Sequence, residues 1–451
     1  MKASTPRQLI YTLFILAGLL PGSALAASFY INTHSAGAMG NALAGGASMP
    51  DDASVNFFNP AMLSRLEGQN LTVGGHWIAP EAEFSDRNSR AAFGTPGEQP
   101  MPGEDGKTDK SAVVPNLYYS VPIDDQWTFG LGINAPFGLE TSYNDDWVGR
   151  YHALDTELQV LNINPNVSFR VNDRLSLGFG INYQRSDATL TNAIDSFGAC
   201  IAAGGDQTTC GTAHGGPANA DNDSEVEISG DDDAFGINVG AHYEMEDGTL
   251  VGLSWRQGVS HTLEGDVKFD RSASCAADPS CSVATQDGDI EADLELPDII
   301  SLSVAHPVSE RLTGMFDISW FRWSQLEEIV IERDDGTELS TLEFDYDDTF
   351  RVAMGAQYQL QDNWLLRGGL AFDKAPQTSS DMLSPRFPDG NRRLFSVGAR
   401  FEWTQNASID MAFNHVNMSS VSINNVEQGH LLDGNFDPEA NIVSVQGNWR
   451  F

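Results

Sequence analysis

Apolar residues alternate with small or polar residues along most of this chain, and this alternation restricts the fold more than any other feature. In residues 175–183, Leu, Leu, Phe, Ile and Tyr occupy every second position, with Ser, Gly, Gly and Asn between them. Because successive side chains of a strand point to opposite faces, one face of such a strand is apolar and the other is small or polar. The pattern recurs in residues 127–134, 235–243, 249–255, 350–358, 364–372, 395–403 and 409–413. We therefore predict an all-β fold.

The connections between these segments come in two lengths. Short polar turns are predicted at residues 123–126, 172–174, 244–248, 308–311, 361–363 and 404–406. Long acidic or Gly-rich connections are predicted at residues 88–110, 137–155, 192–225, 270–288, 334–338, 376–390 and 424–438. Short turns at one end and long loops at the other are typical of outer-membrane barrels, in which the short turns face the periplasm. Together these connections predict a transmembrane antiparallel β-barrel of about 14 strands, an even number as expected of a single bacterial chain.

A soluble β-sandwich is the alternative fold, because its half-buried strands also alternate. Three features favour the barrel: a secretion signal, aromatic residues at strand ends beside turns (Trp127, Trp364, Trp403), and a last strand that ends on Phe451. That ending resembles the signal read by the machinery that assembles outer-membrane barrels, which we expect as a partner during biogenesis. We expect the finished barrel to be a monomer that contacts outer-membrane lipids and lipopolysaccharide.

The N-terminus has the organisation of a cleaved signal peptide. Lys2 and Arg7 precede an apolar run at residues 9–20, and residues 24–26 (Ala-Leu-Ala) form a small-x-small cleavage pattern. The apolar run is about a dozen residues, whereas roughly 20 are needed to cross a bilayer as a helix. We therefore predict a signal peptide at residues 1–26 and no transmembrane helix.

Charge and cysteine content narrow the possible partners. The 25 Lys and Arg against 63 Asp and Glu give a net charge of -38, which argues against a nucleic-acid partner because phosphate binding needs clustered cations.

The four cysteines form two close pairs, Cys200 with Cys210 and Cys275 with Cys281, and disulfides persist in exported proteins. We expect two local disulfides. Neither pair has metal-ligand spacing, and we expect no metal site and no cofactor.

The residues before the first predicted strand, near Asn70, have a different pattern. Gly and Ala replace the alternation in residues 35–48, so this segment neither fits a barrel wall nor supplies the core of a soluble domain. We expect residues 27–69 to form a small hatch, a plug inside the lumen of an outer-membrane barrel formed by residues 70–451.

Short motifs in the hatch segment point to one family of such barrels. They are Ser28-Phe29-Tyr30-Ile31-Asn32, Ser35-Ala36-Gly37, Asp51-Asp52-Ala53-Ser54 and Asn59-Pro60-Ala61. In this order, after a signal peptide and before a barrel, they resemble the hatch of FadL proteins, and Asn59, Pro60 and Ala61 match the family's hallmark triplet. The resemblance extends along nearly the whole mature chain. It implies an outer-membrane transporter for passive uptake of long-chain fatty acids or related hydrophobic compounds.

A second matching region includes Pro136 and Gly138. In FadL proteins the third strand has an inward kink that opens a gap in the wall, and these two residues occupy the corresponding place. Proline inside a strand also removes a ladder hydrogen bond. The resemblance therefore implies lateral exit of the ligand through the wall. The alternative is that Pro136 merely ends the strand at the membrane surface. The loops with the cysteine pairs fall where the family's two large extracellular loops form a first, low-affinity ligand site.

Candidate ligand-binding residues follow from this resemblance and from strand parity. The apolar candidates are Phe29, Phe57, Phe58, Leu158, Val160 and Phe321. Filling the barrel core is the alternative role for each. Four arginines also point inward by parity: Arg256, Arg351, Arg367 and Arg400. We expect most of them to pair with lumen carboxylates such as Glu402 or Asp410. Arg256 and Arg351, which lie farther from the periplasmic turns, are the candidates for binding a ligand carboxylate.

Other functions stay in competition. FadL-family members also carry aromatic hydrocarbons, so uptake of aromatic or aliphatic hydrocarbons is the alternative within the family. An outer-membrane lipase or protease is less favoured, because no Gly-x-Ser-x-Gly motif occurs and the nine histidines form no cluster. We therefore expect no catalytic residues. A general porin is also less favoured, since a water-filled channel needs no hatch.

Overall fold

A computed structural model describes residues 28–451, and the predicted signal peptide lies outside these residues. Fourteen antiparallel strands form a closed barrel, and five of them are interrupted and carry two labels. In order they are β1 (Asn70–Asp86), β5 (Ala112–Pro122), β6 (Trp127–Ser142), β7 (Asp155–Arg170), β8 (Leu175–Ile194), β9 (Ser224–Glu244), β10 with β11 (Leu250–Arg256, Ser260–Asp270), β12 with β13 (Gly288–Glu295, Ile299–Ser309), β14 with β15 (Leu312–Phe321, Glu328–Arg333), β16 with β17 (Glu338–Glu343, Thr349–Gln361), β18 (Trp364–Asp373), β19 (Arg392–Thr404), β20 with β21 (Ala407–Met418, Val421–Glu427) and β22 (His430–Arg450). β22 pairs with β1 from Arg450↔Asn70 to Gly434↔Asp86, which closes the sheet on itself.

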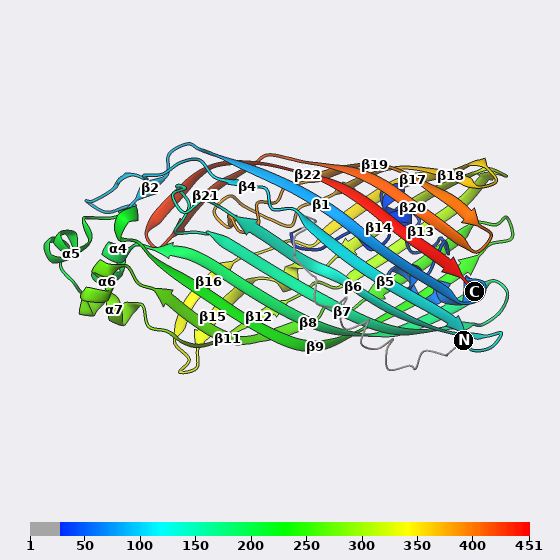
Figure 1. The fold of residues 1–451 in the computed structure, drawn as a ribbon, viewed down its shortest axis with the longest axis horizontal. Coiled ribbons are helices and arrows are strands. Elements are labelled where there is room, and N and C mark those ends of the chain that lie inside the picture. Colours follow the sequence, from blue (N-terminus) through cyan, green and yellow to red (C-terminus); the bar gives the residue numbers. More distant parts are fainter. Residues whose placement is uncertain (1–27) are drawn as a thin grey trace, which may run out of the picture.

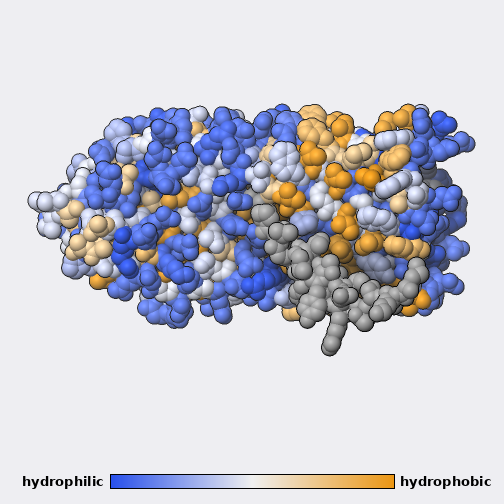
Figure 2. Space-filling view, in the orientation of Figure 1, coloured by the Kyte–Doolittle hydropathy of each residue, from blue (hydrophilic) through white to orange (hydrophobic). Residues whose placement is uncertain are grey.

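The outer surface has an apolar band where the strands cross the membrane. On β8, Leu177, Phe179 and Ile181 are exposed by 43–45%, whereas the lumen-facing Asn182 is buried. Farther along the same strand the outward positions are polar. Hydrophobic residues accordingly gather over the half of the barrel away from helices α4–α7, and the rest of the visible surface is largely hydrophilic (Figure 2). The long strands therefore extend well beyond the membrane at one end.

The two ends of the barrel differ as the connection lengths predict. The short turns lie at one end, and the long loops lie at the other with α4 (Ser196–Ala202), α5 (Gln207–His214), α6 (Ala273–Ala277) and α7 (Pro279–Ala284) (Figure 1). Shorter elements of the loops are β2 (Arg90–Ala91), β3 (Gln99–Pro100), β4 (Lys107–Thr108) and η2 (Ala220–Asn222), and η3 (Trp323–Gln325) lies at the interruption between β14 and β15. We refer to these as the short-turn end and the long-loop end. No helix among residues 28–451 is long and apolar enough to cross a membrane.

Two predicted loops are wrong in extent. The connection predicted at 137–155 begins only after Ser142, because β6 resumes its pairing with β7 at Phe137. The connection predicted at 424–438 is a hairpin of β21 and β22, paired from Val421↔Phe436 to Glu427↔His430. This hairpin extends beyond the apolar band, where Asn and Asp on its outer face contact water, so the apolar alternation that marks a membrane strand is absent.

Residues 28–69, the inner segment, lie against the lumen face of the wall. They include the helices α2 (Ala36–Gly40), α3 (Val55–Phe58) and η1 (Pro60–Arg65) and are buried almost throughout. The inner segment approaches the wall at glycine positions: a Cβ atom at Gly178 would overlap the backbone of Ala61, and one at Gly252 would overlap that of Ala47. The small residues on the inward parity of these strands therefore make room for the inner segment.

Asn59 fastens this segment to the barrel. Its side-chain amide donates to the carbonyl oxygens of Ala47 at 2.8 Å and Ala241 at 3.0 Å, and its Oδ1 accepts from the amide of Ala61 at 3.1 Å. Pro60 then occupies the first position of η1, where a missing N–H costs nothing. The Asn59-Pro60-Ala61 motif thus combines a helix cap with a cross-link to β9.

Candidate functional site

The hydrogen-bond ladder of the wall is incomplete at β6. Strands β5 and β6 pair only from Leu117↔Ile133 to Pro122↔Thr128, so residues 112–116 of β5 have no partner on β6. On its other side β6 has a register shift against β7 between Asn134 and Phe137. The alternative in which Pro136 ends the strand is wrong, because β6 runs on to Ser142.

The start of the inner segment pairs with β6 at this interruption. The amide of Ile31 donates to the carbonyl oxygen of Pro136 at 2.8 Å, and the amide of Gly138 donates to the carbonyl oxygen of Phe29 at 2.9 Å. Tyr30 and Phe137 form an antiparallel bridge between these bonds. Residues 29–31 therefore occupy a strand position on the lumen side of β6.

An apolar cavity, which we call the upper pocket, lies toward the long-loop end. Its cavity volume is about 60 Å³, and its lining includes the candidates Phe29 and Leu158. The other lining residues are Thr156, Glu157, Ala188, Leu190, Ile228, Gly230, Leu263, Ile290, Ala292, Leu294, Ile329, Ile331, Leu342 and Phe387. Phe29 belongs to an aromatic cluster, with its ring 5.1 Å from that of Trp323 and 5.8 Å from that of Phe387. The lining suits an acyl chain or another hydrocarbon group.

A second cavity, the lower pocket, contains two further candidates. Its cavity volume is about 40 Å³, and its lining includes Phe57, Phe58 and Arg256. The remaining two candidates are buried but line neither pocket: Val160 is 1% exposed, and Phe321 packs its ring 5.1 Å from that of Tyr30. The six apolar candidates are therefore divided between two pockets and the packed layer between them.

The two anchor candidates differ in their surroundings. The Arg256 guanidinium donates to Asn182 Oδ1 and to the carbonyl oxygen of Phe57, and it stacks 4.3 Å above the Phe57 ring. Arg351 donates to the carbonyl oxygen of Ala42 and lies 4.0 Å from Asp317. Arg256 thus faces neutral acceptors beside a pocket, whereas Arg351 has an acidic neighbour.

Arg367 and Arg400 form an ionic network with the inner segment. Both pair with Asp410, and the Arg400 Nη2 to Asp410 Oδ2 distance is 2.8 Å. Arg367 also lies 3.1 Å from Asp51, and Arg400 3.1 Å from Asp52. The expected pairing with Asp410 is confirmed. The other carboxylate we considered, Glu402, lines a polar cavity at the short-turn end instead.

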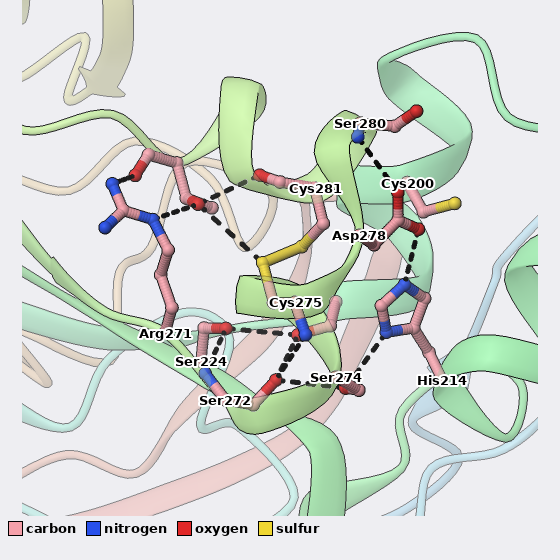
Figure 3. The surroundings of a disulfide bond; sticks show 12 residues. Cys200, His214, Ser224, Arg271, Ser272, Ser274, Cys275, Asp278, Ser280 and Cys281 are labelled. Carbon is pink, nitrogen blue, oxygen red and sulfur yellow. Dashed lines mark hydrogen bonds and ion pairs between the residues drawn. A yellow bond between two sulfur atoms is a disulfide. The ribbon is translucent and has the colours of Figure 1, made fainter.

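The long-loop helices are held together by the two expected disulfides. Cys200 is bonded to Cys210 and Cys275 to Cys281. His214 joins the two loops, since its ring nitrogens lie 3.1 Å from Ser274 Oγ and 3.1 Å from Asp278 Oδ2 (Figure 3). The hydrogen bond to His214 lowers the pKa of the Asp278 carboxyl below its usual value.

These residues also form a group with metal-ligand spacing. Ligand atoms of Cys200, His214 and Asp278 lie within 4.8 Å of one another. Because the sulfur of Cys200 is bonded to Cys210, it offers no thiolate to a metal ion. The group is better described as a cross-link between two loops.

Sequence reasoning missed two parts of the site. Asp51 and Asp52 belonged to a family motif, but their pairing with wall arginines depends on how the inner segment folds. Arg386 lies in the 376–390 connection and is 3% exposed, although nothing in a loop without periodicity marks a residue as buried. In such a loop, an arginine next to a phenylalanine is only a weak indication that the arginine is buried.

Comparison with known proteins places the chain in a family. A family model described as outer membrane protein transport protein (OMPP1/FadL/TodX) matches residues 18–451. The chain belongs to this family. The family consists of outer-membrane transporters, and the expected FadL relationship, outer-membrane location and 14-stranded barrel are confirmed.

Individual relatives align with nearly the full length of this FadL-family chain. Outer membrane protein P1 of Haemophilus influenzae is 28% identical over 436 residues, which is 93% of this chain and 92% of that protein. The long-chain fatty acid transport protein of Escherichia coli K12 is 26% identical over 427 residues, 91% of this chain and 92% of that protein.

Two solved structures share the fold. A Pseudomonas aeruginosa FadL homologue has a TM-score of 0.85 at 23% identity, with 94% of this chain and 100% of that chain covered. The Pseudomonas putida toluene transporter TodX has a TM-score of 0.67 at 18% identity, with 88% and 94% covered.

Proposed function

We propose that this barrel takes up long-chain fatty acids or related hydrophobic compounds by passive diffusion, with lateral exit through the wall beside β6. The observation that carries this proposal is the pairing of residues 29–31 with β6 at its interruption. Phe29 lines the upper pocket while its carbonyl oxygen is bonded to Gly138. Displacement of one short segment would therefore open the floor of the pocket and uncover the incomplete part of the wall. In this proposal residues 27–69 act as the hatch.

The energetics favour exit into lipid. Burying sixteen methylenes contributes about 13 kcal/mol at about 0.8 kcal/mol per methylene, whereas one hydrogen bond to a carboxylate adds only about 1.5–3 kcal/mol. A ligand that continued toward the short-turn end would enter a cavity lined by Asp51, Asp52, Arg400 and Glu402. There its apolar surface would lose most of that burial energy. Exit into the hydrocarbon of the membrane retains it.

The residues beside the pockets bear on whether the substrate is a fatty acid or a hydrocarbon. We propose that Arg256, rather than Arg351, is the cation available to a ligand carboxylate in the lower pocket, because Arg256 has only neutral acceptors and an aromatic ring around it. Hydrocarbon uptake is the alternative, since the lining of the upper pocket is apolar and a relative of the same fold is a toluene transporter. The ionic network around Asp410 would keep the body of the hatch fixed while residues 29–31 move.

We infer further that the protein is a transporter and not an enzyme, in keeping with its family. The proposed barrel works as a monomer in contact with outer-membrane lipids and lipopolysaccharide, after insertion by the barrel assembly machinery. Its long-loop end, with the disulfide-linked helices, would face the outside and receive the ligand first.

Uptake in cells tests the function. A bacterial strain that lacks its own transporters of this family would be complemented with this chain and supplied with labelled oleate or labelled toluene. Accumulation of either compound supports hydrophobic uptake, and the ratio assigns the substrate class. Accumulation of neither, together with swelling of protein-containing liposomes in sugars, would make the barrel a porin.

A further inference from the structure

Arg386 is a buried arginine whose hydrogen bonds all go to uncharged groups. It lies in the loop between β18 and β19 and is 3% exposed. Its Nη1 donates to Thr156 Oγ1 at 3.0 Å and to the carbonyl oxygens of Asp155 at 3.2 Å and Thr191 at 3.1 Å. Its Nη2 donates to Asn192 Oδ1 at 3.0 Å, and its Nε has no partner. A guanidinium has five N–H donors in a planar fork, so the Nε edge and one N–H of Nη2 remain free.

Most buried arginines of this protein are paired with acids. Within residues 28–451 the buried arginines are Arg150, Arg256, Arg351, Arg367, Arg386, Arg392 and Arg400. All but Arg256 and Arg386 have a carboxylate oxygen within 4.0 Å. Burying a cation without a counter-charge is costly. The free edge of Arg386 is therefore a place where an anion would lower the energy of the protein.

The position of Arg386 defines what kind of anion fits. Thr156, which accepts from Arg386, and Phe387, the next residue, both line the upper pocket. A ligand with its apolar part among these side chains would have its polar end within reach of the guanidinium. We propose that Arg386 binds the carboxylate of a long-chain fatty acid whose acyl chain enters the upper pocket and widens it, which makes a free acid the preferred ligand of this site. This inference rests on the proposed function, uptake of a hydrophobic compound.

The acidic groups around Arg386 leave this role open to a ligand. Glu427 and Asp155 act on Arg386 electrostatically, but neither carboxylate lies within ion-pair distance. Burial raises the pKa of Glu427 to about 7, so near neutral pH this side chain carries only part of a negative charge. Burial also lowers the pKa of Arg386 to about 10, which still leaves the guanidinium protonated. A carboxylate in fork geometry at Nε and Nη2 would be the strongest acceptor at the site.

Binding of matched ligands tests the inference. The full mature barrel in lipid nanodiscs would be titrated with labelled oleate and with labelled methyl oleate, which has the same chain without the charge. We expect the wild-type protein to bind oleate at least tenfold more tightly. Arg386→Gln should remove this preference, and Arg386→Lys should restore part of it. Arg185→Gln, which removes an exposed arginine from β8, is the control for net charge.

Each outcome decides between the proposals. Equal affinity of the wild-type protein for the two ligands overturns the assignment of Arg386 and leaves hydrophobic uptake standing. Binding of neither ligand overturns the proposed function itself. A folded Arg386→Gln barrel that keeps the preference for oleate also overturns the assignment, and Arg256 is then the other buried arginine of residues 28–451 without a carboxylate partner. The wild-type comparison does not depend on any variant folding, and heat-modifiability in detergent gels reports whether each variant has folded.

Discussion

The amide of Ile31 donates a hydrogen bond to the carbonyl oxygen of Pro136 at 2.8 Å, across the one place on β6 where the register with β7 shifts. The neighbouring bond from Gly138 to Phe29 ties the same strand to a residue of the upper pocket. The upper pocket and the incomplete wall are thus connected through three consecutive residues. In a barrel wall, a backbone group freed from such a bond needs a new partner, so in the proposed route ligand entry would be linked energetically to opening of the wall.

Straightening β6 should block uptake without unfolding the barrel. Two residues of β6, Ala135 and Pro136, lie opposite a single residue of β7. Deleting Ala135 and replacing Pro136 by Val should restore a continuous ladder with β7, which would let the rest of β6 pair with β5. We expect uptake of labelled oleate to fall at least tenfold while the protein still migrates faster unheated than boiled. Recovery of the protein as a soluble periplasmic species would contradict the barrel itself.

A proline in the neighbouring strand supplies the control. Pro165 on β7 lies opposite Leu131 in the regular part of the ladder, so Pro165→Val should leave uptake unchanged. A straightened variant with a crystallographically closed wall and undiminished uptake would rule out lateral exit. A path through the lumen to the short-turn end would then be the better account.

Removing the carboxylate shared by two buried arginines should destabilise the barrel. Asp410 is 0% exposed and pairs with both Arg367 and Arg400. Asp410→Asn leaves two guanidinium groups with only the Asp51 and Asp52 carboxylates, and breaking a buried ion pair in this way costs about 3–5 kcal/mol. We expect a clear drop in the temperature at which the fast-migrating band of the folded protein disappears from detergent gels. The exposed pair of Arg185 with Asp187 offers the contrast, since Asp187→Asn should shift stability by less than about 1 kcal/mol.

Reduction should loosen the long-loop helices and spare the barrel. The disulfides close segments of 10 and 6 residues, each worth about 2–3 kcal/mol in the chain-entropy account. After treatment with dithiothreitol, we expect proteases to cut near α4–α7 while heat-modifiability persists. Peptide mapping of the untreated protein should recover Cys200 linked to Cys210 and Cys275 linked to Cys281. A peptide that links Cys200 to Cys275 would refute local pairing.

Strand parity explains what the sequence could predict. Arg400 and Asp410 lie on adjacent strands at inward positions, and the short turn between β19 and β20 places them directly opposite each other. Alternation plus turn length is enough to predict such a contact. The same reasoning identified Arg256 as a lumen residue. The cysteines were correctly paired on other grounds, namely their short separations in an exported chain.

Residues outside the regular strands escaped prediction because their neighbours depend on tertiary folding. Arg386 and Asp52 belong to segments without a period, so the sequence indicates neither their burial nor their partners. The hairpin of β21 and β22 was missed for a related reason. Its outer face contacts water and not lipid, so the apolar alternation that is typical of membrane-spanning strands is absent there.

The ionisation of Glu427 should make fatty acid binding depend on pH. Burial raises its pKa to about 7 against the opposing effect of Arg386, from 4.5 in an unfolded chain. The folded protein therefore holds this proton more tightly than the unfolded chain does. The resulting stabilisation is fully present below about pH 4.5 and is lost as the pH rises to about 7.

Above that pH the charged Glu427 carboxylate competes with a ligand for Arg386. We expect the affinity for oleate, relative to methyl oleate, to fall severalfold between pH 6 and pH 8. Glu427→Gln should abolish this change. Because oleate titrates identically in the assays of the variant and the wild type, a difference between their pH profiles reports the titration of the protein and not that of the ligand. An identical pH profile in the variant and the wild type would exclude Glu427 as the titrating group.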